Sequence, residues 1–142
     1  MLDFGGGEAR MIIAEAFQRI EEANQFCYPL AFWMRFEEFA SLIETTWFQT
    51  EYPGVRLVVT HENVLALRQA DPDLPVDLIP FMIVAGQQFP DYYGFQVSRR
   101  TAEENIELPV MVWCLHAYVH CWDAGFGAFL NELQSQYAVQ SM

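Results

Sequence analysis

The residues best suited to metal chemistry lie close together in the last third of the chain. Cys114, His116, His120 and Cys121 offer sulfur and imidazole, which are ligands that zinc prefers. Structural zinc sites usually use two close pairs separated by a loop, whereas along a strand the first three side chains would share one face and Cys121 the other. The spacing therefore favours buried or half-buried strand faces, and we expect no bound metal and no other cofactor.

Nucleophilic and acid–base catalysis find little support in the sequence. A cysteine nucleophile needs a nearby histidine oriented by a carboxylate, but Cys114 and His116 are two residues apart on one strand, with side chains ~7 Å apart. Two pairs of adjacent acids, Glu37–Glu38 and Glu103–Glu104, could suggest a hydrolase. Adjacent acids on a helix point apart, and acids on a loop are usually solvated, so neither pair is typical of an acid–base site. Gly5–Gly7 precedes a helix without following a strand, so it is no phosphate loop. We expect a protein that is not an enzyme, and a small metal-dependent enzyme is kept as the third hypothesis.

The net charge points instead to protein binding. The chain has 19 acidic residues against seven basic ones, all of them arginine, for a net charge of -12. Nucleic acid is a poor partner for such a chain, since phosphate binding depends on Lys and Arg. An acidic surface would be steered towards a cationic protein, and aromatic residues could anchor the complex. The candidate partner-binding residues are Asp71, Asp73, Asp77, Asp91, Tyr92, Tyr93, Glu103, Glu104 and Glu107.

Apolar content and cysteine usage give an expected compartment. The longest apolar run, Leu78 to Ala85, has eight residues and contains Pro80, against the ~20 that a membrane-spanning helix needs. The start of the chain, with Asp3 and three glycines, lacks the features of a signal peptide, and we expect residues 1–7 to be a flexible leader. Three cysteines in an apolar-rich chain are typical of reduced core thiols. We expect a cytoplasmic protein that makes no membrane contact.

Helical periodicity predicts helices in the first half of the chain. Apolar residues recur at helical spacing over residues 8–24 and again after Pro29. Tyr52-Pro53-Gly54 predicts a turn followed by a strand from Val55. Thr60 is suited to cap a helix that ends before Asp71, where a Pro/Asp loop begins.

The second half has the pattern of a sheet followed by a helix. Segments 78–85, 92–97 and 110–122 are β-branched or aromatic and are separated by Gly86, Pro90 and Pro109, which predicts three or four strands. Asp123 is placed to cap a last helix with apolar residues at helical spacing from Phe126. The order predicts one α+β domain over residues 1–142, an antiparallel or mixed sheet with helices packed on one face.

A series of short motifs resembles the SUKH superfamily, which includes cell-wall assembly regulators and bacterial toxin-immunity proteins. Residues 78–81 (LIPF) and 90–95 (PDYYGF) are similar to two of its strands. Val110, Val112, Trp113 and His116 resemble its V-x-x-W-x-H strand, and Phe126, Phe129 and Leu130 resemble its last helix. The motifs follow the family's order over residues 52–133. Pro90 stands where the family usually has glycine, and Gly125 where serine is common.

The resemblance implies an α+β fold without catalytic residues and a role in neutralising a bacterial toxin. The first hypothesis is therefore an immunity protein, or antitoxin, that binds one cognate toxin, for example a nuclease or another cationic effector domain, through its acidic surface. The alternative is a non-enzymatic regulatory scaffold or adaptor of the cell-wall assembly regulator type. Either could be a monomer or a homodimer.

Overall fold

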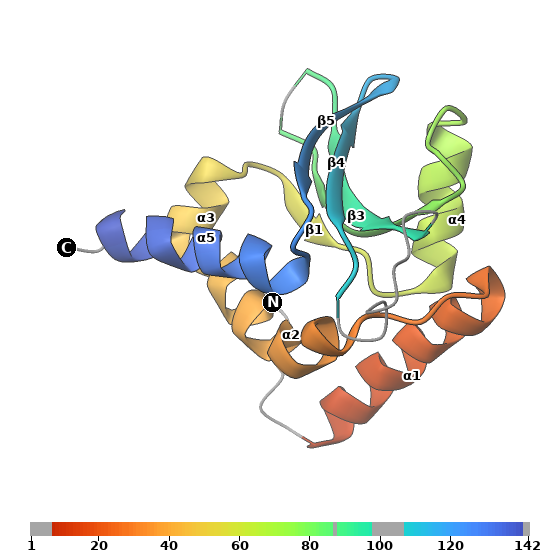
Figure 1. Ribbon diagram of the computed structural model, residues 1–142, viewed down its shortest axis with the longest axis horizontal. Coiled ribbons are helices and arrows are strands. Elements are labelled where there is room, and N and C mark those ends of the chain that lie inside the picture. The colour runs from red at the N-terminus through yellow and green to blue at the C-terminus, as the bar shows by residue number, and fades with distance from the viewer. Residues whose placement is uncertain (1–6, 87, 98–106, 141–142) are drawn as a thin grey trace.

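A five-stranded sheet flanked by helices forms the body of the computed structural model, which describes residues 7–86, 88–97 and 107–140, with side chains from residue 14 onward (Figure 1). In chain order the elements are α1 (Gly7–Asn24), α2 (Leu30–Ile43), α3 (Thr46–Glu51), β1 (Val55–Leu57), α4 (His61–Ala70), β2 (Leu78–Val84), β3 (Asp91–Gln96), β4 (Val110–Cys114), β5 (Ala117–Trp122) and α5 (Phe126–Gln140). The α+β class is confirmed. Gly7, predicted as part of the leader, belongs to α1, and residues 1–6 lie outside the described part.

The helix starts follow local chemistry. Pro29, with φ -64°, directly precedes α2, where a residue without an amide hydrogen costs nothing. Thr60 caps α4 as predicted, because its hydroxyl accepts a hydrogen bond from the Asn63 amide at 3.1 Å. Thr45 caps α3 in the same way through Phe48 at 3.2 Å. The sequence analysis did not predict α3, which is a six-residue helix.

The sheet is an antiparallel meander in the order β1-β2-β3-β4-β5. The segment 110–122 is two strands, because Leu115 and His116 adopt positive φ angles of 47° and 72° and turn the chain back on itself. Positive φ at both central residues gives a tight turn whose twist matches that of the strands. The prediction that Cys114, His116 and His120 follow one continuous strand was therefore wrong.

One sheet face carries the main hydrophobic core. Side chains from α1, α2, α3, α5 and the middle strands form one cluster in which eight phenylalanines are almost fully buried: Phe17, Phe32, Phe39, Phe48, Phe81, Phe95, Phe126 and Phe129. Many of their rings meet edge to face, the arrangement that aromatic quadrupoles prefer. The aromatic stripe of α2 thus packs the core.

The other sheet face is covered as well. Leu78, Ile83, Tyr92, Met111 and Trp113 form a second buried cluster with Leu74 from the loop after α4, and Leu67 of α4 packs against it. All seven residues of β2 are consequently buried, which explains the unbroken apolar run in the sequence. The loop after α4 is thus held against the sheet.

The cap of α5 differs from the prediction. The helix begins at Phe126, and the Phe126 and Gly127 amides donate to the Glu107 carboxylate at 2.8 and 2.9 Å. We predicted that Asp123 would supply this cap. A carboxylate 19 residues upstream takes the position because the chain enters β4 beside the start of α5, and sequence spacing contains no sign of that contact.

Candidate interaction surface

The proline- and aspartate-rich loop between α4 and β2, residues 71–77, holds three of the candidate acids. Its start is ordered by its own backbone: the Asp71 amide donates to Leu67, and the Asp71 carbonyl accepts from Leu74 at 3.1 Å. The Asp71 carboxylate also accepts from the Asp73 amide at 3.3 Å. Because Leu74 is 3% exposed within the second cluster, the loop is fixed to the sheet, with Asp73 exposed and Asp71 and Asp77 half-buried.

Arg68 of α4 holds the second half of this loop. Its guanidinium donates to the carbonyls of Val76 and Leu78 at 3.3 and 3.4 Å, and to the Asn24 side chain of α1 at 3.2 Å. Partial burial lowers the pKa of this guanidinium from its ordinary value. An arginine fork suits such a position, because it can bond several oxygens at once. The arginine therefore serves the loop's shape and links it to both neighbouring helices.

The β4–β5 hairpin meets the loop at two points. The His116 imidazole lies 3.0 Å from the Asp73 carboxylate, and the Tyr118 hydroxyl donates to Asp77 at 3.4 Å. Burial and the nearby Asp77 raise the pKa of Tyr118 to about 12, so the phenol remains a donor at neutral pH. The side chains of His116 and Asp73 are 65% and 60% exposed, so this contact is open to a partner. We call the loop 71–77 with His116 and Tyr118 the acidic loop surface.

The sequence predicted the aspartates of this surface but not its two hairpin residues. It singled out the three acids, whereas Tyr118 was not considered and His116 was weighed as a metal ligand or a family motif. The helix cap at Thr60 and the loop signal Asp71-Pro72 located the acids, but their contact with a hairpin about 40 residues downstream follows from the fold alone.

The remaining candidate residues are dispersed. Asp91 is half exposed at the start of β3, where it pairs with Val84 of β2. The Cys114 thiol donates a hydrogen bond to the Asp91 carboxylate. Burial and, to a lesser extent, this carboxylate raise the pKa of the thiol. Tyr92 and Tyr93 are only 3% and 8% exposed, on opposite faces of the sheet, and burial raises the pKa of both phenols. The two tyrosines thus belong to the cores, away from any surface that a partner could touch in this conformation.

Two candidate acids cannot be placed, and a third has a structural contact. Glu103 and Glu104 lie outside the described residues. Glu107 is half-buried, and burial raises the pKa of its carboxylate even though the bonded amides oppose the shift. Its two oxygens are directed at the start of α5, so it is not part of the acidic loop surface.

Within residues 7–86, 88–97 and 107–140 there is no group of three or more His, Cys, Asp or Glu residues that could hold a metal ion. The four residues considered first are divided by the hairpin, where Cys114 pairs with Ala117, and Cys121 with Met111. His120 instead contacts the Trp122 ring, with centroids 4.2 Å apart.

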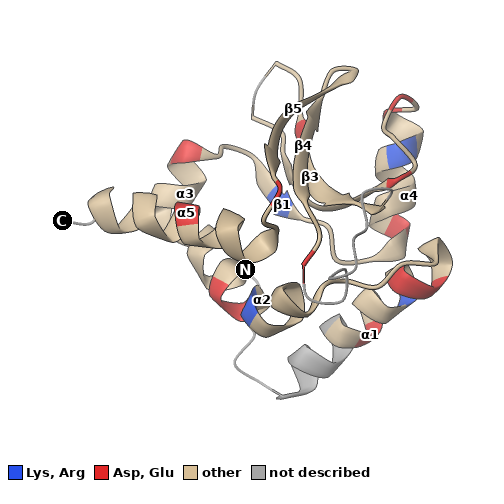
Figure 2. Cartoon of the chain, viewed as in Figure 1, with Lys and Arg blue, Asp and Glu red and all other residues tan. Residues whose placement is uncertain are grey.

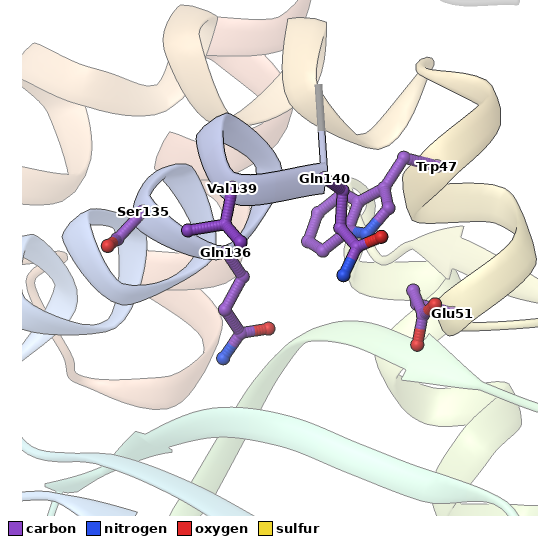
Figure 3. Close-up of a pocket in the computed structure, with 6 residues that line it drawn as sticks. All are labelled: Trp47, Glu51, Ser135, Gln136, Val139 and Gln140. Atoms are coloured by element: carbon purple, nitrogen blue, oxygen red, sulfur yellow. The ribbon is translucent and has the colours of Figure 1, made fainter. Parts of the chain in front are cut away.

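A shallow hollow of about 370 Å³ lies between α3 and α5 (Figure 3). Trp47 and Glu51 line it from α3, and Ser135, Gln136, Val139 and Gln140 from α5. It is open to solvent and combines one carboxylate with two amides and the Ser135 hydroxyl, and neither histidine nor lysine, the usual activating bases of a serine nucleophile, lines it. The hollow offers no catalytic constellation.

Charges on the described surface are mostly acidic. Figure 2 shows Asp and Glu on helices and loops around the molecule, with few Arg among them. Arg35, on α2, donates to Glu38 at 3.1 Å and to Asn131 of α5 at 2.8 Å, and so joins two helices. Arg68 is likewise bound within the fold.

Comparisons with known proteins yield no relative: no family model, curated protein or solved structure matches the chain. Within the described part, none of the helices has the length and apolar character needed to cross a bilayer. The structure thus defines the class as α+β with a five-stranded antiparallel meander.

Proposed function

We propose that this chain is a SUKH-like immunity protein that binds a cognate bacterial toxin through the acidic loop surface. The observation that carries the proposal is the fixed shape of the loop that bears three aspartates: Arg68 and buried Leu74 hold its backbone, and two hairpin side chains contact Asp73 and Asp77. A partner that meets such a loop finds it already ordered. Little conformational entropy is then lost on binding, which favours high affinity.

Electrostatics supports the same proposal. With a net charge of -12 and no lysine, the chain attracts cationic surfaces from a distance. Toxins that act on nucleic acids need cationic clefts, and a protein that covers such a cleft blocks access of the substrate. Complementary charges increase the association rate more than the affinity, and salt weakens their effect over the Debye length of ~8 Å at physiological ionic strength.

The motif order adds independent support. The motifs that resemble SUKH strands fall on β2, β3 and β4, except that His116 lies in the turn after β4, and those that resemble its last helix fall on α5.

The proposal expects a toxic domain to be encoded beside this chain's gene, and the test is the rate at which the two proteins associate. Neutralising Asp73→Asn together with Asp77→Asn should slow association about tenfold at low salt and much less at high salt. Glu44→Gln, an exposed acid at the end of α2, is the matched control and should leave the rate near that of the wild type. Equal rates for the double variant and the control would refute the assignment of the surface. Several weak partners without toxin neutralisation would favour the adaptor alternative.

A further inference from the structure

Strand β1 forms the edge of the sheet opposite β5, and within the described residues it pairs only with β2. The Val58 amide, directly after the strand, donates to the Phe81 carbonyl of β2 at 2.9 Å. Because the direction of main-chain groups alternates along an antiparallel strand, the N–H and C=O groups of Arg56 also face β2, and those of Val55 and Leu57 face outward. Positions 55 and 57 thus offer their main-chain groups to an added strand at the spacing of a regular strand.

A hollow lies on each side of β1. One of about 180 Å³ lies between β1 and α4, on the sheet face of the second cluster. The other, of about 360 Å³, lies between β1 and the region where α2 is joined to α3, on the face of the main core. Arg56 and Leu57 line both hollows, which therefore meet at β1. Because successive side chains of a strand point to opposite faces, a strand added beside β1 would direct them alternately into one hollow and the other.

The two hollows differ in charge. Besides Arg56, the larger one is lined by four apolar and two polar residues: Ile43, Val55, Leu57, Val59, Glu44 and Gln49. Its apolar side chains favour an apolar residue, and exposed Glu44 disfavours a second acid. On the other face Arg56 is exposed beside Ile83 of β2, and within the described residues its guanidinium makes no hydrogen bond or ion pair. An added strand therefore meets an unpaired positive charge on that face.

We propose that β1 binds an extended segment of another protein, antiparallel to it, in which one acidic residue lies between two apolar ones. The apolar residues exchange main-chain hydrogen bonds with Val55 and Leu57 and direct their side chains into the larger hollow. The acid lies opposite Arg56, in the type of pair whose side chains are closest in an antiparallel sheet. In such strand addition, main-chain bonds supply the affinity, and the side chains select the partner.

Arg56 also decides against a second copy of this chain as the occupant. A charge on a short edge strand is one way in which proteins discourage unwanted pairing. In the register that joins all the outward groups of two β1 strands, Val55 lies opposite Leu57 and the two Arg56 side chains lie opposite each other, where like charges are destabilising. An acid in place of the second arginine turns this repulsion into attraction.

The β1 site and the acidic loop surface are independent of each other. They share no residue, and they select opposite charges: β1 takes an acidic segment, and the acidic loop surface a cationic one. The β1 site therefore does not depend on the proposed function, and either one can fail without the other.

The test is an NMR titration of the isotope-labelled protein with the capped peptide STVEVTS and with its lysine counterpart STVKVTS. The glutamate peptide should shift the Val55 and Leu57 amide resonances and slow the exchange of both amides with solvent. The lysine peptide should bind roughly fivefold to tenfold more weakly. An unchanged Leu57 amide at millimolar glutamate peptide, or equal affinity for the two peptides, would overturn the proposal. A dimeric protein whose Leu57 amide exchanges slowly without peptide would assign the edge to a second copy and would overturn it too.

Charge reversal keeps the test independent of misfolding. Arg56→Glu should reverse the preference, so that the lysine peptide binds more tightly than the glutamate peptide by a similar factor, a gain that an unfolded variant could not show. Arg19→Glu, the same change at an exposed position of α1, is the matched control and should keep the wild-type preference. The same preference in both variants would contradict the pairing with Arg56.

Methylation of the peptide main chain tests the register. N-Methylation of either valine beside the glutamate should abolish binding, because these amides donate to β1 in the proposed register. N-Methylation of the glutamate should leave the affinity within about twofold, since its amide points away from β1. Equal effects of the two modifications would contradict the register.

Discussion

Replacing Glu107 by alanine should destabilise the protein by removing the cap of α5. The carboxylate accepts hydrogen bonds from the first two amides of the helix, at 2.8 and 2.9 Å. The helix contributes four buried side chains to the core: Phe126, Phe129, Leu130 and Leu133. Loss of the cap therefore weakens the packing of the largest cluster as well as the helix end.

The magnitude follows from the two bonds and their environment. Removing a side-chain cap costs ~0.5–2 kcal/mol, and the favourable interaction of a carboxylate with a helix N-terminus adds ~0.3–1 kcal/mol. Because Glu107 is only half-buried, water can partly replace the carboxylate as the acceptor for the Phe126 and Gly127 amides in the variant. We expect a loss of about 2 kcal/mol in the free energy of unfolding, or roughly 6–10 °C in Tm for a chain of this size.

Chemical denaturation of two variants provides the assay. Asp123→Ala removes the acid that sequence spacing favours as the cap, and it should cost less than ~0.5 kcal/mol, as expected for a surface substitution. Glu107→Ala should cost several times more. An equal or larger loss for Asp123→Ala would refute the assignment of the cap.

Three further outcomes follow from single contacts. Gly94→Ala should cost ~2 kcal/mol or more, since a Cβ would overlap the Ile79 carbonyl of the adjacent strand; a loss below ~1 kcal/mol in urea unfolding would contradict this contact. Tyr28→Phe should be neutral or stabilising within ~1 kcal/mol, because the buried hydroxyl has no hydrogen-bond partner in the described part, and clear destabilisation would reveal one. Burial raises the pKa of Glu107, so the folded state binds a proton at this carboxylate more tightly than the unfolded chain does. Unfolding curves should therefore show the wild type gaining stability relative to Glu107→Gln as pH falls from neutral towards 4.5. A loss of stability relative to Glu107→Gln over this range would contradict the raised pKa.

Local patterns predicted most of the fold. Helical spacing located α1, α2 and α4, and the cap at Thr60 is confirmed, because these signals act over a few residues. Three segments after residue 78, predicted as three or four strands from β-branched and aromatic runs between glycine and proline, form four strands. The turn at Leu115 and His116 was missed, since neither is a residue type that usually adopts positive φ. Short α3 was missed because six residues give too little periodicity.

The candidate surface was predictable only in part. The three acids of the loop 71–77 lie close together in the sequence, in a segment whose prolines and aspartates predict a loop. Their contacts with Arg68, His116 and Tyr118 depend on how the loop folds back over the sheet. The burial of Tyr92 and Tyr93 on both faces was not evident either, because a sheet covered on both sides leaves no polar alternation to show which face is exposed.

Calorimetric titration of this chain with the toxic domain that the proposed function expects beside its gene tests the central claim most directly. The account predicts a stoichiometric complex with a Kd in the nanomolar range or below, ~-12 kcal/mol, that weakens as salt rises. Absence of a complex at low salt, with both proteins folded, would contradict it.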